Sequence, residues 1–511
     1  NIKSSSAKVV DNNKFYLTFN IDAGDKYYFN DISLKFDDNY SEESFSNFIK
    51  IFKDLKGKKY SVKSLNKVLN EIDKKALQKE FVFINAKYSE KVVDKNKINI
   101  EITLEELEKF YVEKINILGN FITEEKVIRN SLIVDEGDAF NKILFDKSIN
   151  NIKSKNIFET VESEIKNSDS SNNTKIINIT VQEKPTGEIF AGAGTGTSGS
   201  TLTAGIKEKN YLGKGIKLDS NLSISDDTLK GKFKVTNPNY KNTDKSLNTT
   251  LESSSSDFMT ASGYKTTRTG FNIGTGFEQY SDLFINIDLS NYYEKLETSS
   301  TASAIKKKQE GDYFENLISY TVTLNKLNQN FQPSDGHLTK FSQVLPIYSD
   351  DKSIENAFNA SKYYSLSEDL ILSAKLFIKS INSFDDNVRA SKRIYIPASR
   401  LRGFESGKIG PKDGNEYVGG NYGTAMSLNS TVPNFLNGYE NIDLNIFFDA
   451  ANLWHVDYDN TLDSNKIRSA TGLSVNWFTP IGPLSFSYSI PLSEKNTDKT
   501  ESFRFRIGTS F

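Results

Sequence analysis

The C-terminal segment, residues 503–511, constrains the fold most strongly, because its side chains alternate between two kinds. A period of two places successive side chains on opposite faces of a strand. One face carries Phe503, Phe505, Ile507 and Phe511, interrupted by Thr509, and the other carries Arg504, Arg506, Gly508 and Ser510. The segment therefore predicts a β-strand with one apolar and one polar surface, which is typical of the wall of a transmembrane barrel.

The composition favours strands over helices as membrane-crossing elements. Hydrophobic residues are 37% of the 511 and the mean hydropathy is -0.50, yet aromatic residues reach 12%. No uninterrupted apolar run approaches the ~20 residues that a membrane helix needs. In a barrel only every second residue faces lipid, so low mean hydropathy and many aromatic residues occur together. The alternation recurs in Ile442, Leu444, Ile446 and Phe448, and in Leu484, Phe486, Tyr488 and Ile490.

Charge and residue types exclude several classes of function. Lys and Arg total 64 against 66 Asp and Glu, so the net charge of -2 gives no case for nucleic-acid binding. There is no cysteine, and the two histidines, His337 and His455, lie far apart in the sequence, which argues against a zinc site. We expect the basic run Lys306-Lys307-Lys308 to be solvated. No nucleophile with a neighbouring base is visible, so we predict no enzyme, no cofactor and no metal.

Glycine and proline are unevenly distributed and indicate a domain boundary. Residues 1–185 contain only four of the 30 glycines and one of the 10 prolines. We therefore place the boundary at Pro185-Thr186-Gly187. At roughly 20 residues for each strand and its connection, residues 186–511 predict an antiparallel barrel of about 16 strands. A large soluble β-sandwich is the alternative for this half of the chain.

The first half carries a repeated β-α-α-β-β order, which predicts two α+β domains, residues 26–107 and 108–185. In the first, we expect helices at 41–52 and 61–80. The second of these helices places its apolar residues along one stripe. These residues are Val62, Leu65, Val68, Leu69, Ile72 and Ala76.

In the second domain, a strand at 110–118 and the turn Gly119-Asn120 precede two helices and two strands. We expect the helices at 124–132 and 141–155, with Thr123 as the N-cap of the first. Before both domains, Phe15, Leu17 and Phe19 alternate in a lone strand that has no helices. We interpret residues 1–25 as the end of a truncated preceding domain, so that the chain is a fragment.

Several motifs occur in the order in which they occur in one family. They are Ile117-Leu118-Gly119-Asn120, Val127-Ile128-Arg129, Asn210-Tyr211-Leu212-Gly213, Leu401-Arg402-Gly403-Phe404 and Trp477-Phe478-Thr479-Pro480. In these motifs the chain resembles the BamA family, the central subunits of the outer-membrane β-barrel assembly machinery. The resemblance implies periplasmic POTRA domains followed by a barrel in the cell outer membrane. Residues 26–107 match more loosely, because they lack the Gly-Asn turn.

The arginine of the Arg-Gly-Phe motif has a candidate partner. If Phe448 faces lipid, the next residue, Asp449, points into the barrel lumen. A lumenal carboxylate is a natural bidentate partner for an arginine on an infolded loop, so we predict an Arg402–Asp449 pair. A solvated Arg402 is the alternative.

The resemblance implies a second lumenal acid for this arginine, but Asn429 stands at that position. The expected lock of the loop therefore uses one carboxylate and one amide. Its residues are Arg402, Gly403, Phe404, Asn429 and Asp449.

The first barrel strand, residues 189–197, carries alternate glycines. The run lacks the third spacing of a dinucleotide-binding motif and continues as a strand. Glycine weakens a strand and leaves its register loosely fixed, so the seam with the last strand is predicted to be weak. The resemblance implies a lateral gate there, and a crowded lumen is the alternative. The seam residues are Ile189, Phe190, Gly192, Gly194, Gly196, Phe503, Phe505, Ile507 and Phe511.

The resemblance implies a function in membrane insertion. The protein would accept unfolded outer-membrane proteins through its POTRA domains and insert them into the outer membrane. Its partners would be these clients, accessory periplasmic lipoproteins and outer-membrane lipid, with no nucleic acid. A two-partner-secretion or TamA-type translocation barrel is the alternative, and a passive porin would leave the N-terminal repeats unexplained.

Overall fold

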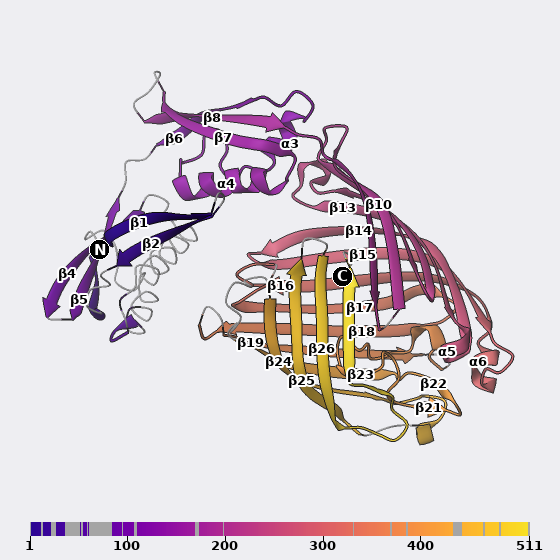
Figure 1. The fold of residues 1–511 in the computed structure, drawn as a ribbon. Helices are drawn as coiled ribbons and strands as arrows, with labels where there is room; N and C mark the ends of the chain where they lie inside the picture. Colours follow the sequence, from indigo (N-terminus) through magenta and orange to yellow (C-terminus); the bar gives the residue numbers. More distant parts are fainter. Residues whose placement is uncertain are drawn as a thin grey trace. The chain divides into compact units, whose positions relative to one another are not determined.

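The computed structural model describes most of the chain and divides it into two units. The described residues are 2–11, 14–21, 27–35, 52, 55–58, 60, 84–94, 96–106, 110–168, 173–197, 199–330, 332–367, 370–384, 387–432, 442–462, 466–479 and 482–508. One unit comprises residues 1–120 and 131–183, and the other comprises 121–130 and 184–511. Figure 1 labels the elements of both. Within the described part, no helix is long and apolar enough to span a membrane.

The first unit begins with an antiparallel pair, β1 (Ile2–Asp11) and β2 (Lys14–Ile21). The expectation of a lone strand around Phe15–Phe19 was therefore wrong. In β1 the apolar residues are Ile2, Ala7, Val9 and Val10, with three consecutive serines between the first two, so its sequence shows no alternation that would reveal a strand.

Two three-stranded sheets follow, with the same strand order and directions. In each, the central strand runs parallel to the first strand and antiparallel to the other. The first sheet is β3 (Tyr28–Lys35), β5 (Lys97–Glu106) and β4 (Ile84–Asp94). The second is β6 (Tyr111–Leu118), β8 (Thr174–Glu183) and β7 (Phe158–Asn167). The helices expected at 41–52 and 61–80 lie outside the described residues, apart from Phe52.

Helix α4 (Lys142–Ser154) covers the second of these sheets. Its residues Phe145, Ile149 and Ile152 follow helical spacing and are buried. On the sheet, Ile177 and Ile179 of β8 are buried as well. One apolar helix stripe and one sheet face thus form the core of this part.

Helix α3 (Glu125–Arg129) lies in the segment 121–130, which groups with the second unit. Its N-cap is Glu124, without a side-chain cap hydrogen bond, so the expectation that Thr123 caps the helix was wrong. The Thr123 hydroxyl instead accepts a hydrogen bond of 2.9 Å from the Asn210 side chain, and both residues are buried. A tertiary contact thus replaces the local cap.

The second unit is a closed antiparallel barrel of 16 strands, which confirms the predicted fold class. The wall strands are β9 (Gly187–Gly196), β10 (Gly199–Tyr211), β11 (Ile216–Ser225), β12 (Thr228–Asn237), β13 (Ser246–Phe258), β14 (Tyr264–Tyr280), β15 (Leu283–Thr298), β16 (Gly311–Asn325), β17 (Gly336–Ser349), β18 (Ser353–Ser365), β19 (Ile371–Ser383), β23 (Tyr422–Val432), β24 (Ile442–Trp454), β25 (Arg468–Thr479), β26 (Gly482–Ser493) and β28 (Phe503–Gly508). The connections contain η2 (Tyr240–Asn242), α5 (Met259–Ser262), α6 (Ala304–Lys308), η3 (Ala390–Lys392), β20 (Gly403–Phe404), β21 (Lys412–Asp413), β22 (Glu416–Tyr417), η4 (Asn460–Leu462) and β27 (Thr500–Glu501).

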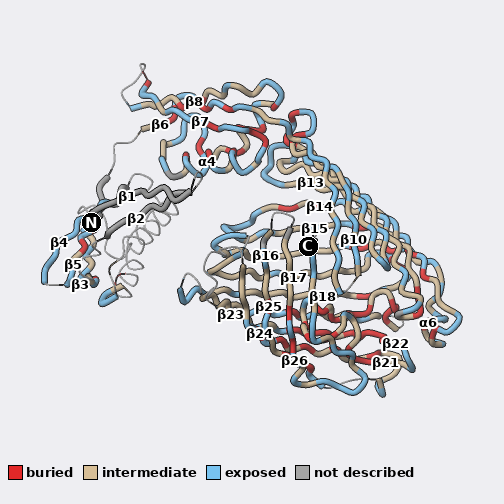
Figure 2. The backbone as a smooth tube through the Cα atoms, viewed as in Figure 1, coloured by how far each residue is buried: buried red, intermediate tan, exposed pale blue. Residues whose placement is uncertain are grey.

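The outer face of the wall is apolar and the buried residues lie inside. Exposed outward side chains include Leu202, Ile206, Leu222, Phe233, Leu251, Phe271, Ile446 and Ile490. Alternation along each strand places polar residues on the inner face. A barrel of this width would leave an open lumen, but buried residues gather there around β21 and β22, as Figure 2 shows.

Candidate functional site

The connection between β19 and β23, residues 384–421, folds into the barrel and is called the long loop here. Its apolar residues pack against inward-facing residues of the wall. The loop contributes Val388, Ile394, Ile396, Leu401, Phe404 and Ile409 to this cluster, and the wall contributes Phe377, Ile381, Ala425, Ala451, Leu453 and Ala470. The loop is therefore held in the lumen by an apolar core as well as by polar contacts.

The structure brings Arg402 and Asp449 together in a bidentate ion pair. Arg402 Nε lies 2.7 Å from Asp449 Oδ2, and Arg402 Nη2 lies 2.8 Å from Asp449 Oδ1. The Arg402 backbone N–H also donates to Oδ2 at 3.0 Å. The Asp449 side chain is 1% exposed, so the pair lies in a low-dielectric site, where its geometry is strongly specified. The Arg402 guanidinium stacks on the Phe447 ring, 3.4 Å from its centroid.

Two further side chains complete the surroundings of Arg402. Asn429 Oδ1 accepts a hydrogen bond of 2.8 Å from Arg402 Nη2, which places the amide where the resemblance implied an acid. Ser427 accepts a bond of 3.2 Å from the same nitrogen and donates one of 2.6 Å to Asp449. Sequence reasoning missed Ser427, although it lies two positions before Asn429 and shares its lumenal face.

Gly403 and Phe404 connect this ion pair to the end of the chain. Gly403 has φ +91°, and a Cβ there would lie 3.0 Å from Ala470 Cβ, so any other residue would be strained at this position. Phe404 is buried, and both residues form β20, which pairs with β27. Glu405 N–H also donates to the Lys499 carbonyl at 3.0 Å. The long loop is thus hydrogen-bonded to the segment that leads directly into β28.

A second anchor of the long loop was not foreseen from the sequence. Arg389 is 2% exposed and pairs with Glu315 of β16, whose side chain is 1% exposed. Lys392 lies 2.5 Å from the same carboxylate and 3.4 Å from Asp351. Ser391 donates to Glu294 of β15 at 2.6 Å. Paired buried charges with specific hydrogen bonds therefore fasten the start of the loop to the wall at β15 and β16.

Two contacts fasten the loop near the ends of the strands. Arg393 pairs with Asp457, and the Val388 N–H donates to the same carboxylate at 2.6 Å. Burial raises the pKa of Asp457, but that hydrogen bond and the charge of Arg393 outweigh it and hold the pKa below its ordinary value of 3.8. Lys306 is buried and lies 2.6 Å from Glu416, so the expectation that the whole basic run is solvated was wrong.

The barrel closes between β28 and β9. Among the described residues, the register pairs are Arg506 with Gly196, Ile507 with Thr195, and Gly508 with Gly194. On its other side β9 pairs with β10 along its whole length, from Gly187 to Gly196. A Cβ on Gly196 would lie 2.5 Å from the Phe505 carbonyl oxygen, so close approach requires glycine there.

The predicted seam residues fall into two groups. Gly194, Gly196 and Ile507 lie in the β28–β9 pairing, and the Thr197 N–H donates to the Phe505 carbonyl at 3.2 Å. For the others the described pairings are on the other side of each strand: Ile189, Phe190 and Gly192 pair with β10, and Phe503 pairs with Tyr488 of β26. Phe511 lies outside the described residues. In the parts that the structure describes, no group of three or more His, Asp or Glu could hold a metal ion.

Comparison with known proteins identifies the family of this barrel and loop. The protein-family model described as the Omp85 superfamily domain matches residues 210–511, more than half of the chain. The chain belongs to the Omp85 superfamily. A second model, POTRA (surface antigen variable number repeat), matches residues 110–184. The Omp85 barrel lies in the outer membrane, with its POTRA domain in the periplasm.

Individual relatives confirm the resemblance to BamA. The chain is 25% identical, over 466 residues, to the outer membrane protein assembly factor BamA of Neisseria meningitidis, covering 81% of this chain and 58% of that protein. The chain thus spans a little over half the length of this relative. The structure of BamA from Haemophilus ducreyi lacking POTRA domains 1–3 matches with TM-score 0.69 and 23% identity, over 95% of this chain and all of that one. CdiB from Acinetobacter baumannii has the same fold, with TM-score 0.55 and 13% identity, over 96% of this chain and 91% of that one.

Proposed function

We propose that this chain inserts other β-barrel proteins into the outer membrane after accepting them unfolded in the periplasm. The observation that carries the proposal is the closure between β28 and β9, where two of the three register pairs among the described residues contain glycine of β9. Membership of the Omp85 superfamily and the likeness to BamA proteins support it.

The proposed mechanism uses the edge of β9. Opening the seam exposes backbone N–H and C=O groups that have no water to pair with in the hydrocarbon layer. A client strand that adds to this edge satisfies them by β-augmentation. The chain thus lowers the barrier to inserting a strand and performs no bond chemistry, so the proposal needs no nucleotide and no cofactor.

In this mechanism the long loop sets the position of the last strand. The Arg402–Asp449 pair fixes the loop. Strand β20 of the loop pairs with β27, which directly precedes β28, so the loop also restrains β28. We propose a structural role for Arg402, Gly403, Phe404, Asn429 and Asp449, because the Arg402 side chain donates hydrogen bonds to Asp449, Ser427 and Asn429 of the wall. A loosened loop should change how the seam opens.

The N-terminal unit supplies the proposed binding surfaces. The sheet β3-β5-β4 has the strand order of β6-β8-β7, so we propose that residues 26–107 form a POTRA domain like residues 108–185. Each sheet has two edge strands that could accept a strand from a client or from an accessory periplasmic lipoprotein. Outer-membrane lipid around the exposed apolar wall completes the proposed partners.

Depletion in the host followed by a census of the other outer-membrane barrels tests the function. We expect the levels of many barrels to fall together, because none would be inserted. Normal levels after depletion would contradict an assembly function. Loss of a single secreted protein, with normal barrel levels, would instead show a dedicated translocation barrel.

A further inference from the structure

A basic cavity of about 420 Å³ lies inside the barrel between the long loop and the last strands. Arg402 borders it from the loop, and Arg504 and Arg506 border it from β28. Neutral hydrogen-bonding side chains of β25 and β26 complete the wall, among them Asn476, Ser485 and Ser487. The cavity therefore combines three guanidinium groups with hydroxyl and amide donors.

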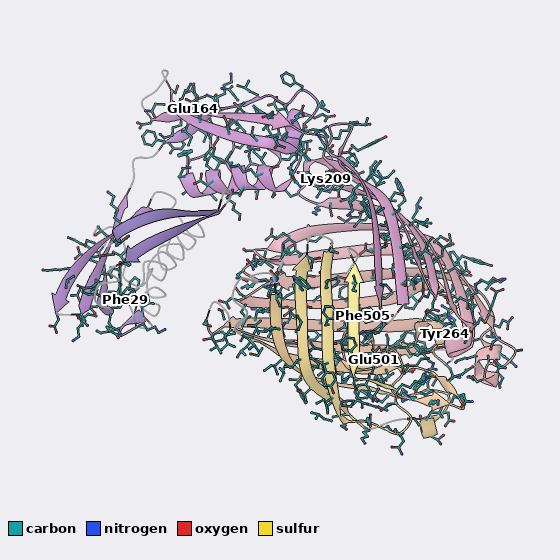
Figure 3. All side chains as sticks on the ribbon, viewed as in Figure 1. Phe29, Glu164, Lys209, Tyr264, Glu501 and Phe505 are labelled. Carbon is teal, nitrogen blue, oxygen red and sulfur yellow. The ribbon has the colours of Figure 1, made fainter. Side chains whose placement is uncertain are left out.

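Strand alternation places Arg504 and Arg506 on the lumenal face of β28. Their neighbours Phe503 and Ile507 are 54% and 36% exposed on the outer face. In register, Arg504 lies beside Ser487 and Arg506 beside Ser485, both of which border the cavity. Figure 3 labels Phe505 on this strand and Glu501 just before it. The wall thus separates the cavity from lipid, so a group that reaches the two arginines must come through the lumen or the seam.

Among the arginines that border the cavity, Arg504 is only partly compensated. Asp449 neutralises Arg402 from outside the cavity, and no acidic residue borders the cavity among the described residues. The Arg504 Nη1 atom is buried without a hydrogen-bond partner in the described part of the chain, and its nearest carboxylate oxygen, on Glu501, is 3.8 Å away. A buried guanidinium N–H that lacks an acceptor is costly, so the site favours a ligand that brings an oxyanion.

We propose that this cavity binds a carboxylate group of a client polypeptide, with Arg504 and Arg506 donating to it. The inference rests on the proposed function, which brings polypeptide to the neighbouring seam. Planar guanidinium groups match carboxylates in geometry, and the Ser487 hydroxyl can donate to a remaining lone pair, whereas the Ser485 hydroxyl already donates to Asn476 at 2.7 Å. The cavity is larger than a carboxylate, so it also holds part of the residue that carries one. That residue is either the C-terminal residue of the client or an internal Asp or Glu.

Peptide binding to the full chain in detergent micelles tests this site. The probes are three nonapeptides that alternate serine and phenylalanine and carry an uncharged dye. One ends in a free carboxylate, one in an amide, and one in an amide with an aspartate at its centre. Fluorescence anisotropy should show that the neutral amide peptide binds roughly tenfold more weakly than at least one of the acidic peptides. The acidic peptide that binds more tightly shows whether the carboxylate comes from the C-terminus or from an internal acidic residue.

Two variants assign the effect to the cavity. Arg504→Gln should weaken binding of the acidic peptide roughly tenfold and leave the neutral peptide unchanged, while Arg504→Lys should retain part of the preference. Lys340→Gln removes a lumenal positive charge of β17, away from this cavity, and should change nothing. Equal affinity of all three peptides for the wild type, or the same loss in Lys340→Gln, would overturn the inference.

The two proposals fail in different ways. A wild-type chain that inserts clients but shows no preference for carboxylates overturns the cavity assignment and leaves the assembly function standing. A chain that binds acidic peptides through Arg504 but inserts no client supports the cavity and contradicts the assembly function. Insertion is measured as protease protection of a barrel client in liposomes that contain the full chain.

Discussion

Two parts of the barrel differ in how firmly their strands are held: the wall at β14, β15 and β16, and the seam between β28 and β9. The wall strands have 17, 16 and 15 residues, and they pair with one another along most of their length. The wall side also holds the long loop through buried charges on Glu294 and Glu315. At the seam, glycines at 194 and 196 meet the last strand. One part of the barrel is thus tied to the long loop by buried charges, whereas the described pairs of the seam contain glycine, which weakens a strand, so we expect the seam to open more easily.

The long loop connects these two parts. Arg389 and Lys392 fasten its first half to the rigid wall, and β20 in its second half pairs with β27 beside the seam strand. Between them, Arg402 is held by Asp449 of β24. A displacement of β28 should therefore be resisted through the loop by the far wall. Substitutions at the two anchors, at the seam and at Asp457 should weaken these contacts to different extents.

Breaking the anchor on the rigid wall should have the largest effect on stability. Glu315→Gln leaves Arg389 and Lys392 buried beside a neutral amide, and the loss of one partner of a buried ion pair costs about 3–5 kcal/mol. Urea unfolding in detergent, followed by the mobility of the folded barrel on gels, measures this. Glu355→Gln is the control, because its pair with Lys379 is about a third exposed and is worth ~0–1 kcal/mol. Equal losses in both variants would contradict the account.

Breaking the central anchor should loosen the loop without unfolding the barrel. Asp449→Asn removes the charge that accepts two hydrogen bonds from the Arg402 side chain. Because charge-assisted bonds are worth about 1.5–3 kcal/mol, protease should cut the loop roughly tenfold faster or more. Arg402→Lys should behave alike, since an ammonium cannot bind in the same bidentate way. Unchanged protease protection together with unchanged assembly activity would refute the lock.

A methyl group at the seam should weaken it further. In Gly196→Ala the new Cβ would lie 2.5 Å from the Phe505 carbonyl oxygen, whereas in Gly231→Ala of β12 the nearest atoms are 4.0 Å away. We expect faster labelling of an Ile507→Cys thiol in the first variant, by roughly threefold to tenfold, and no change in the second. The same labelling rate in both variants would mean that the close approach at Gly196 does not limit opening.

Acid should have the smallest effect, through Asp457. The folded state lowers the pKa of this carboxyl below 3.8, so the ionised form contributes stability at higher pH. That contribution is lost as the pH falls below about 4 and the group becomes protonated. Protease protection of the loop near Val388 should therefore decline in this range. In Asp457→Asn the decline should disappear, and a decline of the same size there would assign it to other groups.

The fold was largely predictable because apolar and polar residues alternate along many strands. An error in placing one strand therefore does not change the predicted fold class. Alternation also placed Asp449 in the lumen, since its neighbour Phe448 is apolar and outward. The Arg389–Glu315 pair could not be predicted in this way. Its residues lie 74 positions apart, and in sequence Glu315 is only one more polar residue on a lumenal face. The Thr123 cap was wrong because local rules cannot anticipate a partner as distant as Asn210.

A disulfide across the seam tests the central claim most directly. The chain has no cysteine, so Thr195→Cys with Ile507→Cys places one possible disulfide across paired strands, at a spacing that disulfides accept. Ala193→Cys with Leu202→Cys joins β9 to β10 as the matched control. Client insertion should stop in the oxidised seam variant, return on reduction, and continue in the oxidised control. Normal insertion with the seam closed by a disulfide would contradict the account.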